Sequence, residues 1–322
     1  MKALVTGATG FIGSHLCEEL ARQGHNVTCL ARDPSNIKWL RGADFKVIQG
    51  DCSDRHSLEN AVAGFDYVFH LAGLTKATKE DDFFRVNAKG TENLIHAVAD
   101  KNPGVKRFLL LSSLAAAGPS RNSTPLTEDA APFPVSAYGR SKLDGEKAVL
   151  QYKGLIPFTI LRPPAVYGPR DRDFYLFFKM LKGGVFLDWG KCYYSLLYVD
   201  DLVKGIINAA ERTEADGNIY FLSDGRIYAN EEIAAEISAA LNTGKGIMRL
   251  KIPRRIMPFL AFISEKVNRH GIINRDKMKE LKYSDWICDS RRASTDFGFK
   301  PVVSIKEGMK WTADWYKTQK WL

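Results

Sequence analysis

The chain has 322 residues, of which 45% are hydrophobic and 26% are charged, and its formal net charge is +9. This is the composition of a globular protein, and the length allows one large domain or two fused domains. No apolar stretch is long enough to span a bilayer, and strand-forming residues begin at Lys2, which leaves no room for a signal peptide. We therefore expect a cytoplasmic protein.

Three glycines near the N-terminus, Gly7, Gly10 and Gly13, lie between a short apolar run and a helical pattern. The run at residues 3–5 is typical of a buried strand, and apolar residues recur at helical spacing from Phe11 onward. In such a turn Gly7 lets the chain reverse sharply, Gly10 leaves room for a pyrophosphate, and Gly13 lets the helix pack closely. The free N–H groups at the start of the helix can bind phosphate. The pattern predicts a dinucleotide-binding turn rather than an ordinary loop.

Strand-like and helical segments alternate along the first half of the chain, which predicts an α/β fold with a doubly wound parallel sheet, a Rossmann fold. After the run at 3–5, the predicted strands cover residues 26–31, 45–49, 67–71, 107–111, 158–161 and 218–222. A helix is predicted over residues 199–210. We expect residues 1–167 and about 195–225 to form the dinucleotide-binding domain. Residues from about 168 to 194 and 226 to 322 would form a smaller C-terminal α/β lobe that binds substrate.

Tyr138 and Lys142 are four residues apart in a helical segment and therefore share one helix face. A neighbouring ammonium favours the phenolate and lowers the pKa of a phenol from its usual value near 10. Tyr138 can then exchange a proton with a substrate hydroxyl or carbonyl near neutral pH. The spacing alone is not specific, because Tyr175 with Lys179 and Tyr316 with Lys320 share it.

The setting distinguishes the first pair, because the predicted strand 107–111 ends in Ser112 and Ser113. A serine at the carboxyl edge of the sheet can hydrogen-bond the oxygen that gains or loses the proton. The alternatives are that the serines form a turn or helix cap and that Tyr138 is a packed aromatic. The combination with the glycine turn favours a catalytic site.

The end of the second predicted strand bears on the choice of cofactor. An acidic residue there binds the ribose hydroxyls of NAD, whereas an arginine favours the extra phosphate of NADP. Here Ala31 occupies the usual acidic position and Arg32 follows it. We therefore favour NADP(H) over NAD(H). The alternative is that Arg32 faces solvent and Asp33 contacts the ribose.

Ordered motifs along nearly the whole chain resemble those of the extended short-chain dehydrogenase/reductase family, which includes NAD-dependent epimerases and dehydratases. They are TGATGFIG at residues 6–13, GD at 50–51, HLAG at 70–73, VNAKGT at 86–91, SS at 112–113, YGRSK at 138–142, RPPAVYGP at 162–169 and YVDD at 198–201. The resemblance implies an enzyme in which Tyr138 is the acid/base and Lys142 binds the nicotinamide ribose. It also implies that Ser113, five residues before Gly118, orients the substrate oxygen.

The resemblance further implies which residues contact the cofactor. Asp51 would contact the adenine, the segment from Leu71 to Gly73 would line the cofactor, and Pro163 to Val166 would border the nicotinamide. The expected cofactor-binding residues are Gly7, Thr9, Gly10, Phe11, Ile12, Gly13, Arg32, Asp51, Cys52, Leu71, Ala72, Gly73, Tyr138, Lys142, Pro163 and Val166. Asp51 can instead cap a turn before a helix near Arg55, and for Asn87 we favour a structural role. Relatives often form dimers through helices, so we expect a homodimer.

The substrate is indicated by Ala165, which stands where sugar-nucleotide epimerases and dehydratases commonly carry an asparagine. The surrounding segments resemble those of hydroxysteroid dehydrogenases and dihydroflavonol reductases. The leading hypothesis is a transfer of hydride between nicotinamide and a secondary alcohol or ketone of a hydrophobic small molecule. The alternatives are a nucleotide-sugar 4-epimerase or dehydratase with retained NAD, and a non-catalytic NADPH-sensing protein.

The basic excess lies in the C-terminal quarter, where residues 251–322 contain 16 Lys or Arg against 8 Asp or Glu. No recognised nucleic-acid module accompanies it, so we expect no nucleic-acid partner. The excess can be a solvated face, or it can attract an anionic substrate or an acidic membrane surface. A basic and apolar segment at residues 252–263 can form a core helix, a hydrophobic entrance for a lipid-like substrate, or a peripheral membrane contact.

The cysteines are odd in number, scattered, and without a Cys-x-x-Cys pair, so a disulfide framework or zinc site is not expected. Buried reduced thiols are the expectation for Cys17, Cys29, Cys52, Cys192 and Cys288. The six histidines, His70 among them, show no ligand spacing. We therefore expect no metal.

Overall fold

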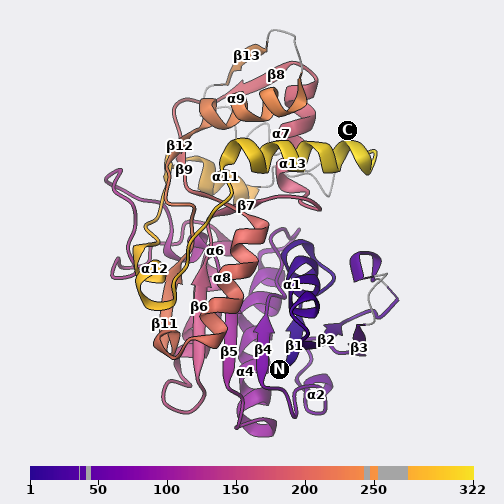
Figure 1. The fold of residues 1–322 in the computed structure, drawn as a ribbon. Helices are drawn as coiled ribbons and strands as arrows, with labels where there is room; N and C mark the ends of the chain where they lie inside the picture. The colour runs from indigo at the N-terminus through magenta and orange to yellow at the C-terminus, as the bar shows by residue number, and fades with distance from the viewer. Residues whose placement is uncertain (36, 41–44, 243–246, 253–274) are drawn as a thin grey trace.

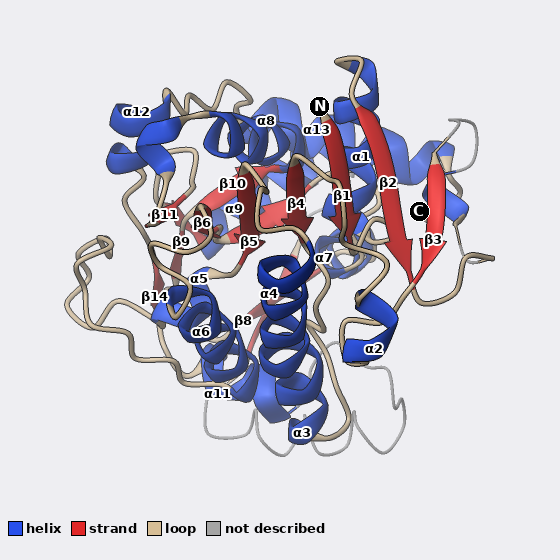
Figure 2. Cartoon of the chain, turned by 90° about the horizontal axis from the view of Figure 1, so that it is seen from below, coloured by secondary structure: helices blue, strands red, loops and turns tan. Residues whose placement is uncertain are grey.

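The computed structural model describes residues 1–35, 37–40, 45–242, 247–252 and 275–322. Its centre is a seven-stranded parallel sheet with the order β11-β6-β5-β4-β1-β2-β3 (Figures 1 and 2). The strands are β1 (Lys2–Thr6), β2 (Asn26–Ala31), β3 (Lys46–Gln49), β4 (Tyr67–His70), β5 (Arg107–Leu111), β6 (Phe158–Arg162) and β11 (Asn218–Phe221). The predicted doubly wound α/β fold is confirmed, and each predicted strand is found to within one residue at either end.

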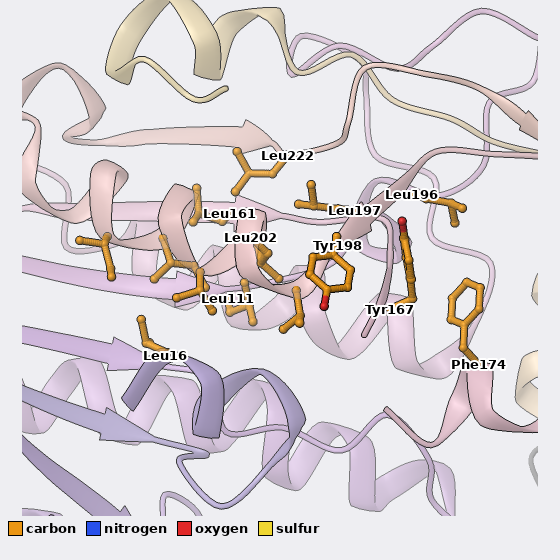
Figure 3. Packing of buried hydrophobic residues seen from close by; sticks show 14 of the residues in the cluster. Leu16, Leu111, Leu161, Tyr167, Phe174, Leu196, Leu197, Tyr198, Leu202 and Leu222 are labelled. Carbon is orange, nitrogen blue, oxygen red and sulfur yellow. The ribbon is translucent and has the colours of Figure 1, made fainter. Parts of the chain in front are cut away.

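Helices cover both faces of this sheet (Figure 2). One face carries α1 (Phe11–Arg22) and α8 (Val199–Glu211), and the other carries α4 (Gly90–Lys101) and α6 (Ala137–Leu150). Strand β5 is buried throughout: Leu109 and Leu111 pack with α1 and α8, whereas Phe108 and Leu110 pack with α4 and α6. Figure 3 shows Leu111 in the first of these clusters. Because both faces are buried, the central strands are nearly continuous apolar runs, which made them recognisable in the sequence.

A second lobe lies over the carboxyl ends of the strands, at the top of Figure 1. Its helices are α7 (Asp173–Lys182), α9 (Asn230–Leu241), α11 (Arg275–Leu281) and α13 (Ile305–Thr318). Its short strands are β8 (Val185–Asp188), β9 (Tyr193–Tyr194), β12 (Tyr228–Ala229), β13 (Met248–Lys251) and β14 (Asp285–Trp286). Strand β9 pairs with β12 and β14, and β8 pairs with β13. Strands β7 (Ala165–Tyr167) and β10 (Leu196–Tyr198) pair with each other near the junction of the lobes.

Shorter helical elements connect these layers. They are η1 (Lys38–Leu40), α2 (Arg55–Leu58), α3 (Glu80–Phe83), the π-helical turn η2 (Phe84–Lys89), α5 (Leu114–Ala117), η3 (Thr213–Ala215) and α12 (Arg291–Phe297). Helix α12 follows the upper lobe in sequence but packs beside β11, with the Phe297 ring edge-on to Tyr220 at 5.0 Å. Residues after 226 therefore contact both lobes.

Among the residues described, none of the helices combines the length and the apolar character needed to cross a bilayer. The expected basic and apolar segment at 252–263 lies outside the described residues, apart from Ile252. All five cysteines are buried free thiols, as expected, and the sulfur atoms of Cys17 and Cys29 lie 3.6 Å apart.

Candidate active site

The glycine turn joins β1 to α1 and rests on the loop that follows β4. Gly7 has φ +73°, and a Cβ there would lie 2.7 Å from the Ala72 amide nitrogen. A Cβ on Gly13 would lie 2.1 Å from the Gly7 carbonyl oxygen, so the start of α1 packs directly on the turn. A Cβ on Gly10 has one near neighbour, the Gly7 carbonyl oxygen at 3.2 Å, and Gly10 is exposed. The outer side of the turn is therefore open at the position where a pyrophosphate needs space.

The N-terminus of α1 is available to an anion. Gly10 is the N-cap and has no side chain to cap the helix, and the Ser14 amide makes the first intrahelical bond, to the Gly10 carbonyl at 3.1 Å. The amides of Phe11, Ile12 and Gly13 precede that bond and point out of the helix. These features fit the phosphates of a dinucleotide.

Arg32 and Asp51 lie close together at the ends of β2 and β3. Burial raises the pKa of Asp51, but hydrogen bonds from Ser53 and the charges of Arg32 and Arg85 outweigh it, so the net pKa is lowered. The Asp51 carboxylate accepts bonds from the Ser53 amide at 2.8 Å and the Ser53 hydroxyl at 2.6 Å. It therefore braces the turn before α2, while Asp54 caps that helix. Arg32 is exposed.

Cys52 and the loop after β4 lie beside this region. The Cys52 side chain is buried, which raises its pKa to about 12, and its carbonyl accepts a hydrogen bond from Asn93 at 3.0 Å. The Leu71 and Ala72 amides bond to the carbonyl and hydroxyl of Thr6, each at 3.2 Å. The segment expected to line the cofactor thus lies against the end of β1, beside the glycine turn.

Ser113, Tyr138 and Lys142 come together at the carboxyl end of β5. The Ser113 hydroxyl lies near enough to the Tyr138 phenol to lower its pKa, and it accepts a bond from the Ala115 amide as the N-cap of α5. Lys142 Nζ donates to the carbonyl of Leu111, the last residue of β5, at 2.6 Å. Because successive side chains of a strand point to opposite sides, Ser112 turns away. Its hydroxyl donates to the buried carboxylate of Glu146.

Burial dominates the acid–base properties of this group. It raises the pKa of Tyr138 to about 12, although the nearby Ser113 hydroxyl opposes the rise. Glu280 and Asp173 raise the pKa further, and Lys277 lowers it. The spacing of Tyr138 and Lys142 predicts a lowered pKa for the phenol, and the structure gives the opposite direction. Burial also lowers the pKa of Lys142 to about 8, while the Glu146 carboxylate acts to raise it.

Asn87 connects the loop after β4 to α6. Its amide group accepts a bond from the Leu74 amide at 2.7 Å and donates to the Leu74 carbonyl and the Ser141 hydroxyl. These contacts give Asn87 the bracing role that we favoured. A Cβ on Gly73 would lie 3.0 Å from Asn87 Oδ1 and 3.6 Å from Lys142 Nζ, so this loop reaches α6.

The segment after β6 borders the same group. Pro163 is buried, and its carbonyl accepts a hydrogen bond from the Leu114 amide at 2.8 Å. Val166 is half-buried on β7 and pairs with Leu197 of β10.

His70 is buried between Thr6 and Thr91, and burial lowers its pKa to about 3. Over the described part of the chain, no cluster of three or more His, Cys, Asp or Glu residues is arranged to hold a metal.

Sequence reasoning missed the residues of α11 that contact α6. The Asp276 carboxylate accepts hydrogen bonds from the amides of Ala137 and Tyr138, and Glu280 accepts one from Ser136. Their spacing shows only a charged helix face, which is usually solvated. No signal in the sequence indicates a contact with residues nearly 140 positions earlier.

Comparison with known proteins agrees with this arrangement. The model of the NAD dependent epimerase/dehydratase family matches residues 3–222. The chain belongs to this family. It is therefore an enzyme of the extended short-chain dehydrogenase/reductase group, as the motifs predicted, and the family is NAD-dependent.

Relatives in this family have different named activities. A ceramide reductase of Caulobacter vibrioides is 31% identical over 99% of this chain and 95% of its own length. A 3 beta-hydroxysteroid dehydrogenase/Delta 5→4-isomerase of Mycobacterium tuberculosis is 28% identical, over 96% of this chain and 88% of its own. An Escherichia coli enzyme, N-acetyl-alpha-D-glucosaminyl-diphospho-ditrans,octacis-undecaprenol 4-epimerase, is 30% identical over 80% and 75%.

The fold is also that of solved structures. UDP-glucuronic acid 4-epimerase from Bacillus cereus, in complex with UDP-glucuronic acid and NAD, is 24% identical with a TM-score of 0.81. The alignment covers 99% of this chain and 100% of that chain.

Proposed function

We propose that this enzyme is an NADP(H)-dependent reductase or dehydrogenase that interconverts a ketone and a secondary alcohol on a hydrophobic small molecule. The observation that carries the proposal is the gathering of Ser113, Tyr138 and Lys142 at the carboxyl end of β5, where Lys142 bonds the Leu111 carbonyl and lies four residues after Tyr138 on α6. The nicotinamide cofactor, when bound, supplies or accepts the hydride. The protein has to hold the substrate oxygen and move one proton at it.

Tyr138 and Ser113 have the chemistry for that proton transfer. The Ser113 hydroxyl orients the substrate oxygen, and the Tyr138 phenol donates a proton to it as the ketone is reduced. A pKa of about 12 keeps the phenol protonated at neutral pH, which is the form needed for reduction. Lys142 holds the ribose of the cofactor.

The preference for NADP(H) rests on Arg32 and Asp33. Arg32 is exposed directly after the last residue of β2, where it can pair with a 2′-phosphate. The Asp33 carboxylate accepts hydrogen bonds from the amide and hydroxyl of Ser35, at 2.9 and 2.6 Å. Both bonds go to Oδ1, so they engage one oxygen of the residue that would otherwise contact the ribose of NAD.

The hydrophobic substrate is supported by the chain's own sequence and by its relatives. Ala165 lies on β7 at the junction of the lobes, where sugar-nucleotide enzymes commonly carry an asparagine. The names of two relatives, a ceramide reductase and a hydroxysteroid dehydrogenase, specify lipid-like substrates. The 30% identical E. coli epimerase supports the alternative, a sugar epimerase with retained NAD.

Two measurements distinguish these functions. The purified protein is tested by thermal shift with NADP⁺, NAD⁺ and UDP-glucose, because a ligand that binds only the folded state raises the Tm. NADPH oxidation is then followed with a 3-ketosteroid and with a long-chain 3-oxo amide. We expect a shift with NADP⁺, none with UDP-glucose, and turnover of at least one ketone. NAD retained through purification, together with a shift by UDP-glucose, contradicts the proposal and supports the epimerase.

A further inference from the structure

Helix α11 of the upper lobe contacts the first turn of α6, the helix that carries Tyr138. The Asp276 carboxylate accepts two backbone hydrogen bonds, from the Ala137 amide at 2.7 Å and the Tyr138 amide at 3.0 Å. Asp276 is 8% exposed. A buried carboxylate with both oxygens bonded to the start of a helix is a strong contact, because the bonds are charge-assisted and the helix dipole is positive there.

A second carboxylate from the same helix completes the capping of α6. Ser136 is the N-cap of α6, and its hydroxyl accepts a bond from the Gly139 amide at 2.9 Å. That hydroxyl donates its own proton to Glu280 at 2.7 Å. The first three amides of α6 are thus satisfied, two directly by α11 and one through a serine that α11 anchors. A helix start needs such partners when it is buried.

Lys277 adds a positive charge to this contact. Its Nζ lies 2.6 Å from Glu280 Oε2, while the other oxygen of Glu280 accepts the Ser136 bond. Two hydrogen bonds, Lys277 to Glu280 and Ser136 to Glu280, therefore link the ammonium to Ser136, which caps the helix that carries Tyr138. The Lys277 side chain is 56% exposed, so it lies at the open side of this contact.

The charged groups around Tyr138 come from three elements. Glu280 and Lys277 belong to α11, Asp173 begins α7 and pairs with Lys76, and Lys142 lies one turn after Tyr138 on α6. Asp173 and Glu280 disfavour the phenolate of Tyr138, and the ammonium of Lys277 favours it. The field at the phenol thus includes groups from the upper lobe, although Tyr138 itself belongs to the nucleotide-binding domain.

We propose that α11 is part of the proton-transfer site: Asp276 is a positioning residue for Tyr138, and the Lys277–Glu280 pair sets the charge beside it. The inference rests on the proposed function, since it assigns these residues to the proton step of the same reaction. It means that the lobe expected to bind substrate also fixes the proton donor. A substrate group that interacts with Lys277 or Glu280 changes the acidity of Tyr138.

The acidity of Tyr138 can be measured without any substrate. The full-length protein is labelled with [ζ-13C]tyrosine, saturated with NADP⁺, and titrated by NMR; the Tyr138 resonance is the one absent from Tyr138→Phe. We expect Glu280→Gln to lower the titration midpoint by about half a pH unit or more, since Gln keeps the acceptor for Ser136 but loses the charge. Lys277→Met is expected to leave Tyr138 un-ionised to a higher pH than in the wild type.

Two matched variants control for effects unrelated to this contact. Lys277→Arg keeps the charge and is expected to keep the wild-type midpoint. Lys282→Met removes a positive charge immediately after the same helix and is expected to change nothing. A Tyr138 midpoint that is the same in wild type, Glu280→Gln and Lys277→Met overturns the electrostatic part of the proposal.

The positioning role of Asp276 is tested by kinetics with NADPH and an aromatic 1,2-diketone. Asp276→Asn loses one of the two oxygen acceptors for the amides of α6. We expect kcat to fall about tenfold and the KM for NADPH to stay unchanged. A tenfold fall corresponds to about 1.4 kcal/mol, the size of one hydrogen bond. Asp276→Glu keeps both oxygens and is expected to recover part of kcat. Equal losses in kcat and in NADPH binding overturn the role. If the wild type reduces no carbonyl compound, the proposed function fails, while the NMR titration still decides whether the Lys277–Glu280 pair sets the acidity of Tyr138.

Discussion

Gly7 and Ala72 approach so closely that a methyl group on Gly7 would lie 2.7 Å from the Ala72 amide nitrogen. This contact joins the end of β1 to the loop after β4. The glycine turn and the loop expected to line the cofactor are thus one packed unit, and the left-handed φ of Gly7 is part of it.

Gly7→Ala is therefore expected to destabilise the fold and to weaken NADP⁺ binding at least tenfold. Left-handed strain contributes about 1–2 kcal/mol and the backbone clash adds about 1–3 kcal/mol. Urea unfolding and calorimetric titration with NADP⁺ measure the two effects. Gly24→Ala is the matched control, because Gly24 has φ +79° but no atom within 4 Å of its Cβ. Equal effects on NADP⁺ binding in both variants would rule out this explanation.

Tyr138→Phe removes the proposed proton donor and is expected to lower kcat by a factor of about 10²–10⁴. NADPH affinity should stay within about twofold, because the ring and its packing remain. Stopped-flow or steady-state oxidation of NADPH with a ketone checks this. Tyr175→Phe is the control, since Tyr175 also precedes a lysine by four residues but bonds the Trp321 carbonyl at 2.6 Å. Normal turnover in Tyr138→Phe would refute the assignment.

Lys142 is expected to make cofactor binding depend on pH. Burial lowers its pKa to about 8, so the side chain is an ammonium below that pH and a neutral amine above it. In the proposed contact with the ribose the amine would donate a weaker hydrogen bond, so NADP⁺ affinity should fall as the pH rises through about 8. Titrations of NADP⁺ on both sides of that pH measure the change. Lys142→Met should bind NADP⁺ more weakly and should lose the pH dependence of binding. If the variant keeps the wild-type pH profile, another group is responsible for that dependence.

Arg32→Ala is expected to weaken NADP⁺ binding by a factor of about 10–100 and to leave NAD⁺ binding nearly unchanged. The reason is the loss of a charge-assisted contact with the 2′-phosphate, worth about 1.5–3 kcal/mol. Dissociation constants for both cofactors test it. Asp33→Asn distinguishes the alternative: if it weakens NAD⁺ binding while Arg32→Ala has no effect, the preference is for NAD.

The strands of the sheet could be predicted because most of them are short apolar runs between polar turns, although the edge strand β3 has only two apolar residues. In β5, four consecutive apolar residues from Phe108 to Leu111 have to be buried on both faces, and only a covered parallel strand does this over so short a length. Strands β9 and β12 have two residues each, too few for any periodicity. Their positions depend on the packing of the upper lobe.

The site was predictable where the backbone fixes it and not where burial does. The positive φ of Gly7 and the shared helix face of Tyr138 and Lys142 follow from local spacing. The raised pKa of Tyr138 depends on how completely the folded chain covers the phenol, which no spacing reveals. The contact of Asp276 with α6 likewise exists only once the two lobes have packed.

The last prediction concerns Asp171, which is 5% exposed and accepts hydrogen bonds from the amides of Asp173 and Phe174. Burial, together with the Asp173 charge, raises its pKa from 3.8 to about 7, although these hydrogen bonds and Lys76 oppose the rise. The folded protein therefore holds a proton that the unfolded chain releases. The resulting stabilisation is complete below about pH 4 and is lost as the pH rises through about 7.

We therefore expect the free energy of unfolding to fall as the pH rises between these values. The fall is up to about 4 kcal/mol for a pKa shift of this size. Asp171→Asn should remove that slope and cost about 1 kcal/mol at acidic pH, because the amide keeps one acceptor. Urea unfolding of both proteins across this pH range gives the difference. In Asp173→Asn the free energy of unfolding should still fall with rising pH, but the fall should end at a lower pH. The reason is that the Asp173 charge, which raises the pKa of Asp171, is gone. If wild type and Asp171→Asn lose stability in parallel, another group is responsible for the pH dependence.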